Sequence, residues 1–477
     1  MLVVPEEIKK IFWQDNINEK TRRNWKLRFF DSDIQLIYPE DTLFPADDLF
    51  PVDQEPFYVI DNRQMQTESL KITESLCESD TLIYGECNAA QFEVTVADVL
   101  QDLTGKEFMA TVEVGGYEMS MGIYTVEQFT RQADRRMKKI TAYDRMRNFS
   151  TDVSEWYQGL KFPMSIREFR CSLCEYVGIK QIDVKLPLDD IQVAKTINPE
   201  QLNGLDVIQA ICEINGCFGH IDKTGRLKYQ FLDKSGLYPS ETLMPSDELF
   251  PNGLSDSENT EQIAFYKQSE TTYEDYVTRT IDRVNIRQED GDIGALYPLD
   301  TGGSNTYVIE GNFLIYGKSA EDLATIASSV YGQVSGISYR PCKIVTSGLP
   351  WVEVGDGLVC YTSDDVIETY CLKRTLSGIQ SMMDTLESSG SSDYEENFGI
   401  QSQITQLEGK AAVIKKNVEE VSVRVTDLKN YTEAQFKVTA EAITSEVYRA
   451  TKAEGELSTK ITQTADTITL EVNKKVT

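Results

Sequence analysis

Residues 38–51, YPEDTLFPADDLFP, recur 200 positions further along as YPSETLMPSDELFP at 238–251. The shared pattern is YPxxTLxPxDxLFP, with a proline at every sixth position. Proline has a fixed φ angle and no backbone N–H, so each copy predicts an extended, turning surface segment rather than a helix or a central strand. Each copy precedes a region rich in strand signals. The repeat therefore predicts two duplicated β domains.

Acidic side chains alternate with the apolar anchors of both copies: Asp41, Asp47 and Asp48 in the first, and Glu241, Asp247 and Glu248 in the second. Calcium binding by these acids is one interpretation. A surface loop clamped by its Leu and Phe side chains is the commoner outcome for such a segment, and we favour it. We therefore assign no metal ligand here.

Residues 1–150 form the first expected β domain. β-branched and aromatic residues, partly in period-two alternation, are bounded by Gly, Asp and Asn, as strands are. The strand candidates are WKLRFFDSDIQLI (25–37), EPFYVIDN (55–62), AAQFEVTVADV (89–99), EFMATVEVGG (107–116) and KKITAYDRM (138–146).

Residues 151–255 show a different period and predict an α/β module that ends in the second copy of the repeat. SIREFRCSLCEYVGI (165–179) and GLDVIQAICEING (204–216) have helical spacing, and the second ends at Asn215-Gly216 as helices do. HIDKTGRLKYQFLD then predicts a hairpin that turns at 223–225.

Residues 256–387 return to strand signals and form the second expected β domain. Its one expected helix is SAEDLATIASSVYGQV (319–334), with Ser319 as N-cap. Residues 388–400 are Ser/Gly-rich and acidic and predict a linker. The strand candidates are VTRTIDRVNIRQED (277–290), NTYVIEGNFLIY (305–316), RPCKIVTSGLP (340–350), GDGLVCYTSDD (355–365) and ETYCLKRTLSG (368–378).

Residues 401–477 predict a coiled-coil stem. Apolar residues recur at alternating spacings of three and four positions from Ile404 to Leu428, which is the a/d heptad pattern of a coiled coil. A second repeat, TAEAITSEV (439–447) and TADTITLEV (464–472), follows these heptads. β-branched residues at both a and d positions favour three or four strands over two. A single amphipathic helix packed on its own globular part is the alternative, and we favour oligomerisation because more than 70 residues follow the linker. The core of the coiled coil is expected at Ile404, Leu407, Ala411, Ile414, Val418, Val421, Val425 and Leu428.

The net charge of −30 lies entirely outside the stem. Residues 401–477 hold 11 basic and 11 acidic side chains, so residues 1–400 hold 36 and 66. Affinity for phosphate depends on Lys and Arg displacing counterions, so this composition excludes an ordinary DNA-binding protein. A charge that keeps a large assembly soluble is one open interpretation.

Catalytic and metal-binding motifs are missing from the sequence. The chain has one histidine, His220, in the expected hairpin, and no GxSxG, HExxH or P-loop pattern. Cys171 and Cys174 form a CxxC without a second CxxC or a nearby histidine, so we interpret them as buried helical cysteines. We expect no catalytic residue, no cofactor and no metal.

The start of the chain and its cysteines bear on where the protein is made. MLVVPEEIKKIFW lacks the features of a secretory signal, and no apolar run approaches the ~18 residues that span a bilayer. Nine scattered cysteines suit free thiols in a reducing compartment. We therefore expect synthesis in the cytoplasm without export by the general pathway, and no membrane-spanning segment.

Three stretches resemble the N-terminal hub region of siphophage tail-tip proteins, the family that includes tail-associated lysins and tail endopeptidases. They are LIYGECNAAQFEVTVADV (82–99), MGIYTVEQFTRQADRRMKKITAYDRM (121–146) and CLKRTLSGIQSMMDTLESSG (371–390). The doubled YPxxTLxPxDxLFP segment and the TADTITLEV type of repeat are also similar to that family.

The resemblance implies a mainly β fold with α+β parts: two tail-tube-like β-barrel domains, the α/β module between them, and a trimeric stem. Three chains with two barrels each form a ring of six in such hubs. It also implies a virion location at the tail tip after assembly in the host bacterial cytoplasm, and a DNA exit path without specific DNA binding. An acidic channel wall that repels the passing DNA is then the second open interpretation of the charge. The expected contacts are with a distal tail protein or tail-tube hexamer, a tape-measure protein and receptor-binding or fibre proteins.

Two other functions stay open at this stage. One is a cell-wall-degrading tail lysin, since many members carry a peptidase or glycosidase domain after the hub. This chain enters the stem instead, so we expect a hydrolase only if the natural chain continues. The other is a receptor-binding tail fibre with the stem as its shaft.

Overall fold

The computed structural model describes residues 1–12, 18, 20–30, 56–134, 136–197, 199, 201–233, 260–288, 294–299, 305–363, 365–391 and 397–398. All of them belong to the unit Met1–Leu407. Both copies of the YPxxTLxPxDxLFP segment and the eight expected stem-core residues lie outside the described residues.

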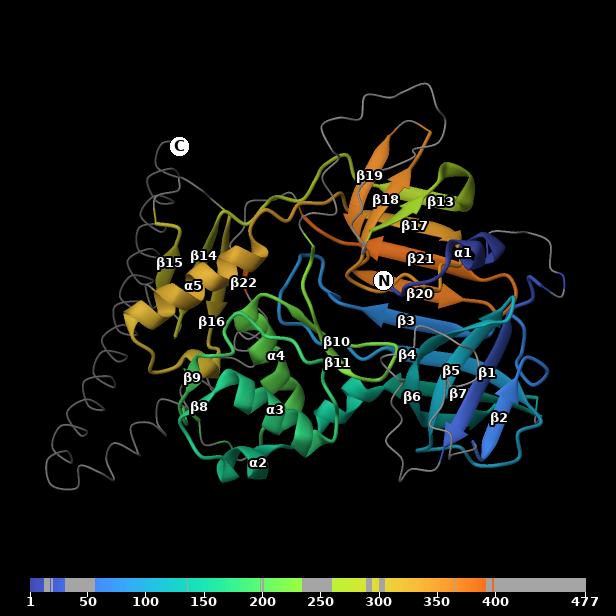
Figure 1. The fold of residues 1–477 in the computed structure, drawn as a ribbon, viewed down its shortest axis with the longest axis horizontal. Helices are drawn as coiled ribbons and strands as arrows, with labels where there is room; N and C mark the ends of the chain where they lie inside the picture. Colours follow the sequence, from blue (N-terminus) through green and yellow to red (C-terminus); the bar gives the residue numbers. More distant parts are fainter. Residues whose placement is uncertain are drawn as a thin grey trace, which may run out of the picture. The chain divides into compact units, whose positions relative to one another are not determined.

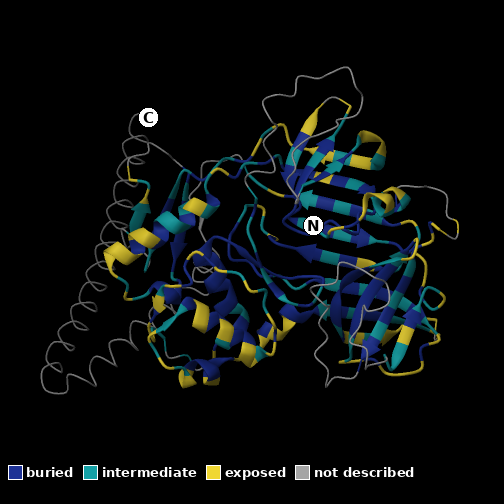
Figure 2. Cartoon of the chain, in the orientation of Figure 1, coloured by how far each residue is buried: buried dark blue, intermediate teal, exposed yellow. Residues whose placement is uncertain are grey.

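One antiparallel sheet of eleven strands dominates this unit (Figure 1). Apolar side chains alternate with polar ones along most of its strands, so one face of each strand is buried and the other is partly exposed (Figure 2). In sheet order the strands are β13 (Gln268–Tyr273), β17 (Cys342–Ser347), β21 (Met383–Ser388), β20 (Lys373–Ser377), β3 (Lys71–Ser75), β4 (Gln91–Ala97), β7 (Met137–Asp144), β6 (Tyr117–Arg131), β5 (Glu107–Val114), β1 (Asn24–Phe30) and β2 (Tyr58–Asp61).

The sheet corrects the expectation of two separate barrels. Strands of the first β region run from β3 to β2, and strands of the second run from β13 to β20. The two sets join where β3 pairs with β20, with Thr73 opposite Thr375. No sheet in the described part of the chain closes on itself. The physical reason is that β3 and β20 each offer an edge, and pairing them satisfies both rows of backbone hydrogen-bonding groups. The expected domain boundaries stay a prediction.

A four-stranded and a three-stranded sheet accompany the main one, along with two sheets of two strands each. Helix α5 packs on β14 and β15 of the first of them (Figure 1). Within the expected linker, β22 pairs in parallel with β16. The first sheet holds β15 (Ala295–Tyr297), β14 (Arg283–Arg287), β16 (Thr306–Glu310) and β22 (Asn397–Phe398); the second holds β12 (Thr260–Ile263), β18 (Gly357–Tyr361) and β19 (Val366–Tyr370).

The three helices expected from periodicity are confirmed as α3 (Ile166–Val177), α4 (Gly204–Asn215) and α5 (Ala320–Val334). The side chain of Ser319 caps α5 as expected, and Ser165 caps α3 in the same way. Gly216 ends α4 with φ of 64°, a left-handed conformation that glycine adopts without strain.

The expected hairpin is also confirmed, as β10 (Phe218–Ile221) and β11 (Leu227–Gln230). The remaining short elements were not expected from the sequence. They are α1 (Glu6–Phe12), η1 (Arg145–Ser150), α2 (Ser154–Gly159), β8 (Met164–Ser165), β9 (Gln192–Val193), η2 (Phe265–Lys267) and η3 (Phe313–Ile315).

Candidate functional site

A buried ion-pair network holds the junction of β3 and β20 together. Glu74 on β3 lies directly opposite Arg374 on β20. The Arg374 guanidinium forms a two-pronged pair with Asp384 of β21, with Nε–Oδ1 and Nη2–Oδ2 distances of 2.9 and 3.0 Å. Its Nη1 lies 3.4 Å from Oε2 of Glu74. Because all three side chains are fully buried, the pairing compensates charges that water does not reach.

Lys223 extends this network to the α/β module. It lies in the turn of the β10–β11 hairpin, and its ammonium pairs with the Glu74 carboxylate. Ser120 of β6 donates a hydrogen bond of 2.7 Å to the Lys223 carbonyl oxygen. The hairpin is thereby fixed against both β3 and β6. One buried carboxylate, Glu74, thus connects the two β regions and the module between them.

Arg145 makes a second connection between the hairpin and the main sheet. Its Nε and Nη2 lie 2.7 and 2.8 Å from the two carboxylate oxygens of Glu107 on β5. Its Nη1 donates to the carbonyl oxygen of Gly225 in the hairpin turn, at 3.1 Å. Gly225 has φ of 81°, and a Cβ there would lie 2.9 Å from the Ile123 side chain, so only glycine suits this turn.

The charges of the network shift the protonation of their neighbours. Burial opposes ionisation of Glu74, but the charges of Lys223 and Arg374 outweigh it and hold the pKa of Glu74 below its ordinary value. Burial, reinforced by the Glu74 charge, raises the pKa of Asp144 to about 7. Burial lowers the pKa of His220 to about 4.

His220 and Asp144 are the groups that a catalytic interpretation of this network would use. Nε2 of His220 and Oδ2 of Asp144 are buried and have no hydrogen-bond partner among the described residues. Neither side chain lines the cavity beside Tyr84 or the hollow beside Asn62. Both side chains are buried among the charges that join the sheets, and this arrangement supports a structural role for the network.

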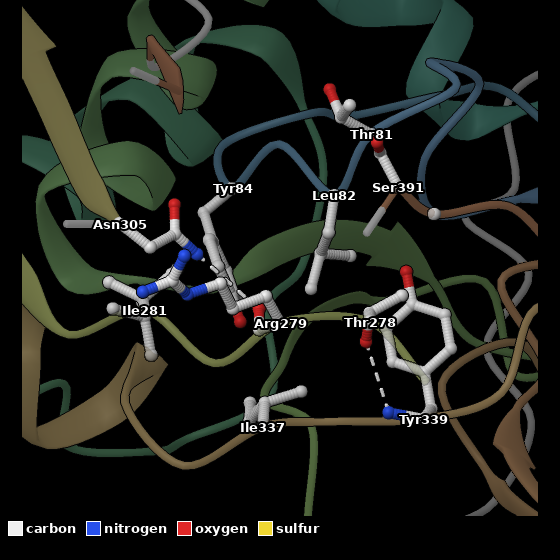
Figure 3. A pocket seen from close by; sticks show the side chains of 12 residues that line it. Thr81, Leu82, Tyr84, Thr278, Arg279, Ile281, Asn305, Ile337, Tyr339 and Ser391 are labelled. Carbon is white, nitrogen blue, oxygen red and sulfur yellow. Dashed lines mark hydrogen bonds between the residues drawn. The ribbon is translucent and has the colours of Figure 1, made fainter. Parts of the chain in front are cut away.

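One cavity is lined by several chain connections that run between the main sheet and the β14–β16 sheet (Figure 3). The backbone N–H of Tyr339 donates to Oγ1 of Thr278 at 3.1 Å, and the Tyr339 hydroxyl donates to the Ser389 carbonyl. The buried hydroxyl of Tyr84 also lines the cavity and has no partner among the described residues. The volume of about 60 Å³ suits about two water molecules at ~30 Å³ each.

The cysteines form no metal site in the described residues, where no group of three or more His, Cys, Asp or Glu side chains is placed to hold an ion. The expectation that Cys171 and Cys174 are both buried is wrong for Cys171, which is exposed. The buried stripe of α3 runs through Ile166, Phe169 and Leu173. At 3.6 residues per turn, Cys171 lies on the side of the helix away from this stripe.

The three stretches that carry the family resemblance come together in space. Residues 82–99 contain β4, residues 121–146 contain most of β6 and all of β7, and residues 371–390 contain β20 and β21. In the main sheet these strands run consecutively as β21-β20-β3-β4-β7-β6, with only β3 added (Figure 1). Stretches almost 300 positions apart in the sequence therefore build one continuous surface.

Sequence reasoning missed β3, and with it Glu74. The strand KITES is short and places a glutamate at an inward position, which a pattern search counts against a strand. The available signal was a buried-strand arginine, Arg374 in CLKRTLSG, which requires a buried carboxylate partner. The eight expected stem-core residues, Ile404 to Leu428, cannot be placed because they lie outside the described residues.

The fold and the network define a mainly β scaffold in which buried ion pairs join sheets and helices. No helix in the described part of the chain is both long and apolar enough to cross a membrane. No protein-family model and no curated protein matches the sequence.

Solved structures of phage tail proteins have similar folds over much of the chain. The 43 kDa tail protein of prophage MuSo2 from Shewanella oneidensis is 11% identical, with a TM-score of 0.45 over 76% of this chain and 97% of its own. A tail protein from Neisseria meningitidis MC58 is 9% identical, with a TM-score of 0.43 over 78% and 98%. Prophage tail protein gp18 from Listeria monocytogenes EGD-e is 11% identical, with a TM-score of 0.39 over 70% and 93%. With TM-scores below 0.5 these likenesses are partial, and the function proposed below is argued from this chain's own residues.

Proposed function

We propose that this chain is a structural hub at the distal tip of a phage tail, where three copies form a ring that continues or closes the tail tube and connects it to the host-recognition apparatus. The observation that carries this proposal is the gathering of the three family-like stretches into consecutive strands of the main sheet. A resemblance due to chance would have no reason to select neighbouring strands.

The buried network supports a rigid structural role rather than an enzymatic one. Glu74, Lys223 and Arg374 tie both β regions and the intervening module into one body. Breaking any one of these pairs leaves an uncompensated buried charge, so relative movement of the parts is strongly opposed. A hub that passes force from tail tip to tail tube requires such a body.

The sheet also supports assembly. β13 and β2 are the outermost strands of the main sheet, and each pairs with one strand only among the described residues. Proteins normally cover or pair such edges, because unpaired backbone groups attract other strands. In the proposed trimer, these edges face neighbouring copies, the stem residues 401–477 lie on the threefold axis, and DNA passes without specific binding.

The direct test of location is immunogold electron microscopy of phage particles that carry this gene, with antibodies raised against the purified chain. We expect gold at the distal end of the tail. Gold along the tail or on the head, or particles that do not label although they contain the chain, would contradict a hub at the tip.

A second assay separates the hub from a lysin. Purified chain is incubated with bacterial cell wall, and the release of soluble fragments is measured against a known cell-wall hydrolase. We expect no release above buffer. Sustained release by the chain itself would replace the structural proposal with an enzymatic one.

A further inference from the structure

Among the described strands, the β6–β7 hairpin leaves the end of β6 without a second neighbour at the rim of the main sheet. β6 has 15 residues, whereas β5 and β7 have 8 each. Its last residues, Gln128 to Arg131, pair with β7 on one side and with no other strand in the part of the chain that the structure describes. Arg131 and Ala133 are exposed. β7 stays paired with β4 as far as Met137, so among the described strands the hairpin exposes the free edge of β6 at Gln128–Arg131 and the turn that follows it.

The charge of this hairpin is opposite to that of the rest of the chain. Residues 128–140 contain five basic and one acidic side chain. The other residues of 1–400 contain 31 basic and 65 acidic side chains. A cationic hairpin end on an acidic body predicts attraction to an acidic surface at close range, within a Debye length of ~8–10 Å.

Part of this charge is already used within the chain. Nε of Arg136 lies 2.8 Å from Oδ1 of Asp98, and Lys139 pairs with Glu93 at 2.6 Å. The Lys138 ammonium lies 4.4 Å above the Phe129 ring, which fixes its position at the base of the tip. Within the described ranges, neither Arg131 nor Lys138 has a carboxylate at ion-pair distance. These two cations are therefore available to a partner.

A complementary surface lies at the opposite end of the same sheet. β13 leaves one edge unpaired among the described strands. Phe265 and Tyr266, directly before it, are 60% and 70% exposed. Glu270 and Glu274 are exposed and have no ion pair with any described residue. The edge thus offers backbone hydrogen-bonding groups, aromatic surface and negative charge together.

The two surfaces do not meet within one copy. β13 is the first strand of the sheet and β7 the seventh. At ~4.8 Å between neighbouring strands, they lie roughly 30 Å apart along the sheet. A second copy, by contrast, presents the same edge as a separate body, and an oligomer of identical chains brings unlike surfaces of neighbours together.

We propose that the β6–β7 hairpin of one copy docks onto the β13 edge of a second copy, with Arg131 and Lys138 facing Glu270 and Glu274. This inference rests on the proposed homo-oligomeric hub and names the contact between neighbouring copies. Ring closure then depends on charge pairing between hairpin and edge, so it weakens with salt.

Photo-crosslinking of the full chain tests this contact. The exposed Ala133 is replaced by p-benzoylphenylalanine, which leaves all charges in place, and isotope labelling of half of the chains distinguishes crosslinks between copies. We expect crosslinks from position 133 to residues 265–275 of another copy. Crosslinks between copies that map elsewhere, or crosslinks to added duplex DNA in preference to protein, would overturn the proposal.

Charge swaps on the crosslinking chain provide the control. Glu270→Lys with Glu274→Lys should lower the yield at least tenfold, and adding Arg131→Glu with Lys138→Glu should restore it. Glu155→Lys with Glu175→Lys makes the same charge change at exposed positions in the α/β module and should leave the yield unchanged. An equal loss of crosslink yield in all variants would mean that net charge alone determines the yield, and it would overturn the specific contact.

The mass of the same sample by light scattering separates this inference from the proposed function. A trimer without the 133-to-β13 crosslink removes the docking contact and leaves the hub. A monomer in the unmodified chain removes both.

Discussion

At the scale of single residues, the chain concentrates its buried charge in one place. Burying Glu74, Lys223, Arg374 and Asp384 is costly, and only their mutual pairing compensates for it. The pairing also selects one arrangement of β3 against β20, because a slip by one residue moves Glu74 to the other face of the sheet and away from Arg374.

Replacing Arg374 by Met should therefore destabilise the fold strongly. The change leaves Asp384 and Glu74 buried with a missing partner, and such losses cost roughly 3–5 kcal/mol. Arg147→Met is the matched control, since Arg147 pairs with Glu127 at the surface, where ion pairs contribute about 0–1 kcal/mol. Urea unfolding monitored by fluorescence measures both. Equal, small losses would mean that the network does not hold the junction.

Asp144 gives the fold a pH dependence of known sign. Its pKa is about 7 when folded and 3.8 ordinarily, so between these values the folded chain keeps a proton that the unfolded chain releases. The contribution of Asp144 to the free energy of unfolding therefore falls as pH rises from about 4 to 7, and it stays low above pH 7. Asp144→Asn removes this penalty and keeps an acceptor for the Met146 backbone N–H.

The free energy of unfolding of Asp144→Asn minus that of the unmodified chain should accordingly rise between pH 4 and pH 7 and then level off. His220 acts in the opposite direction: its depressed pKa of about 4 makes the folded chain lose stability as pH falls below 6.5. The difference between the two chains isolates Asp144 from this effect. A difference that does not change with pH would mean that Asp144 is not buried as an acid.

At the scale of elements, the stem is expected to set the oligomeric state. Ile414→Asp with Val421→Asp places charges in an apolar a/d seam, which costs several kcal/mol at each site in a three-chain core. We predict a shift from trimer to monomer or ill-defined species by light scattering. A trimer that persists would show that the contacts of residues 1–400, including the hairpin and the β13 edge, are sufficient for assembly.

The elements also show what sequence reasoning captures. Helices α3, α4 and α5 followed from 3.6-residue periodicity and from caps at Ser319 and Gly216, which are local signals. The pairing of β3 with β20 joins residues about 300 positions apart, and nothing local specifies it. The same holds for Glu74, whose inward position makes sense only beside Arg374. Local sequence signals thus predicted the helices, while charge pairing between distant residues determined how the strands of the two β regions join.

At the scale of the whole molecule, the net charge of −30 opposes binding to nucleic acid. We predict that the purified chain retains duplex DNA negligibly in a filter-binding assay, even at low salt, where any cationic patch binds most strongly. The β6–β7 hairpin is too small an exception, with Arg136 and Lys139 already paired. Strong retention that vanishes in Arg131→Glu with Lys138→Glu would instead make the hairpin a DNA contact.

In the proposed assembly, three copies of this chain form a ring with a stem. Electron microscopy of the purified full chain, with class averages viewed along and across the particle, tests it most directly. We predict a threefold ring in the axial view and a rod projecting from it in the side view. Single particles of one chain, or rods without a ring, would contradict it.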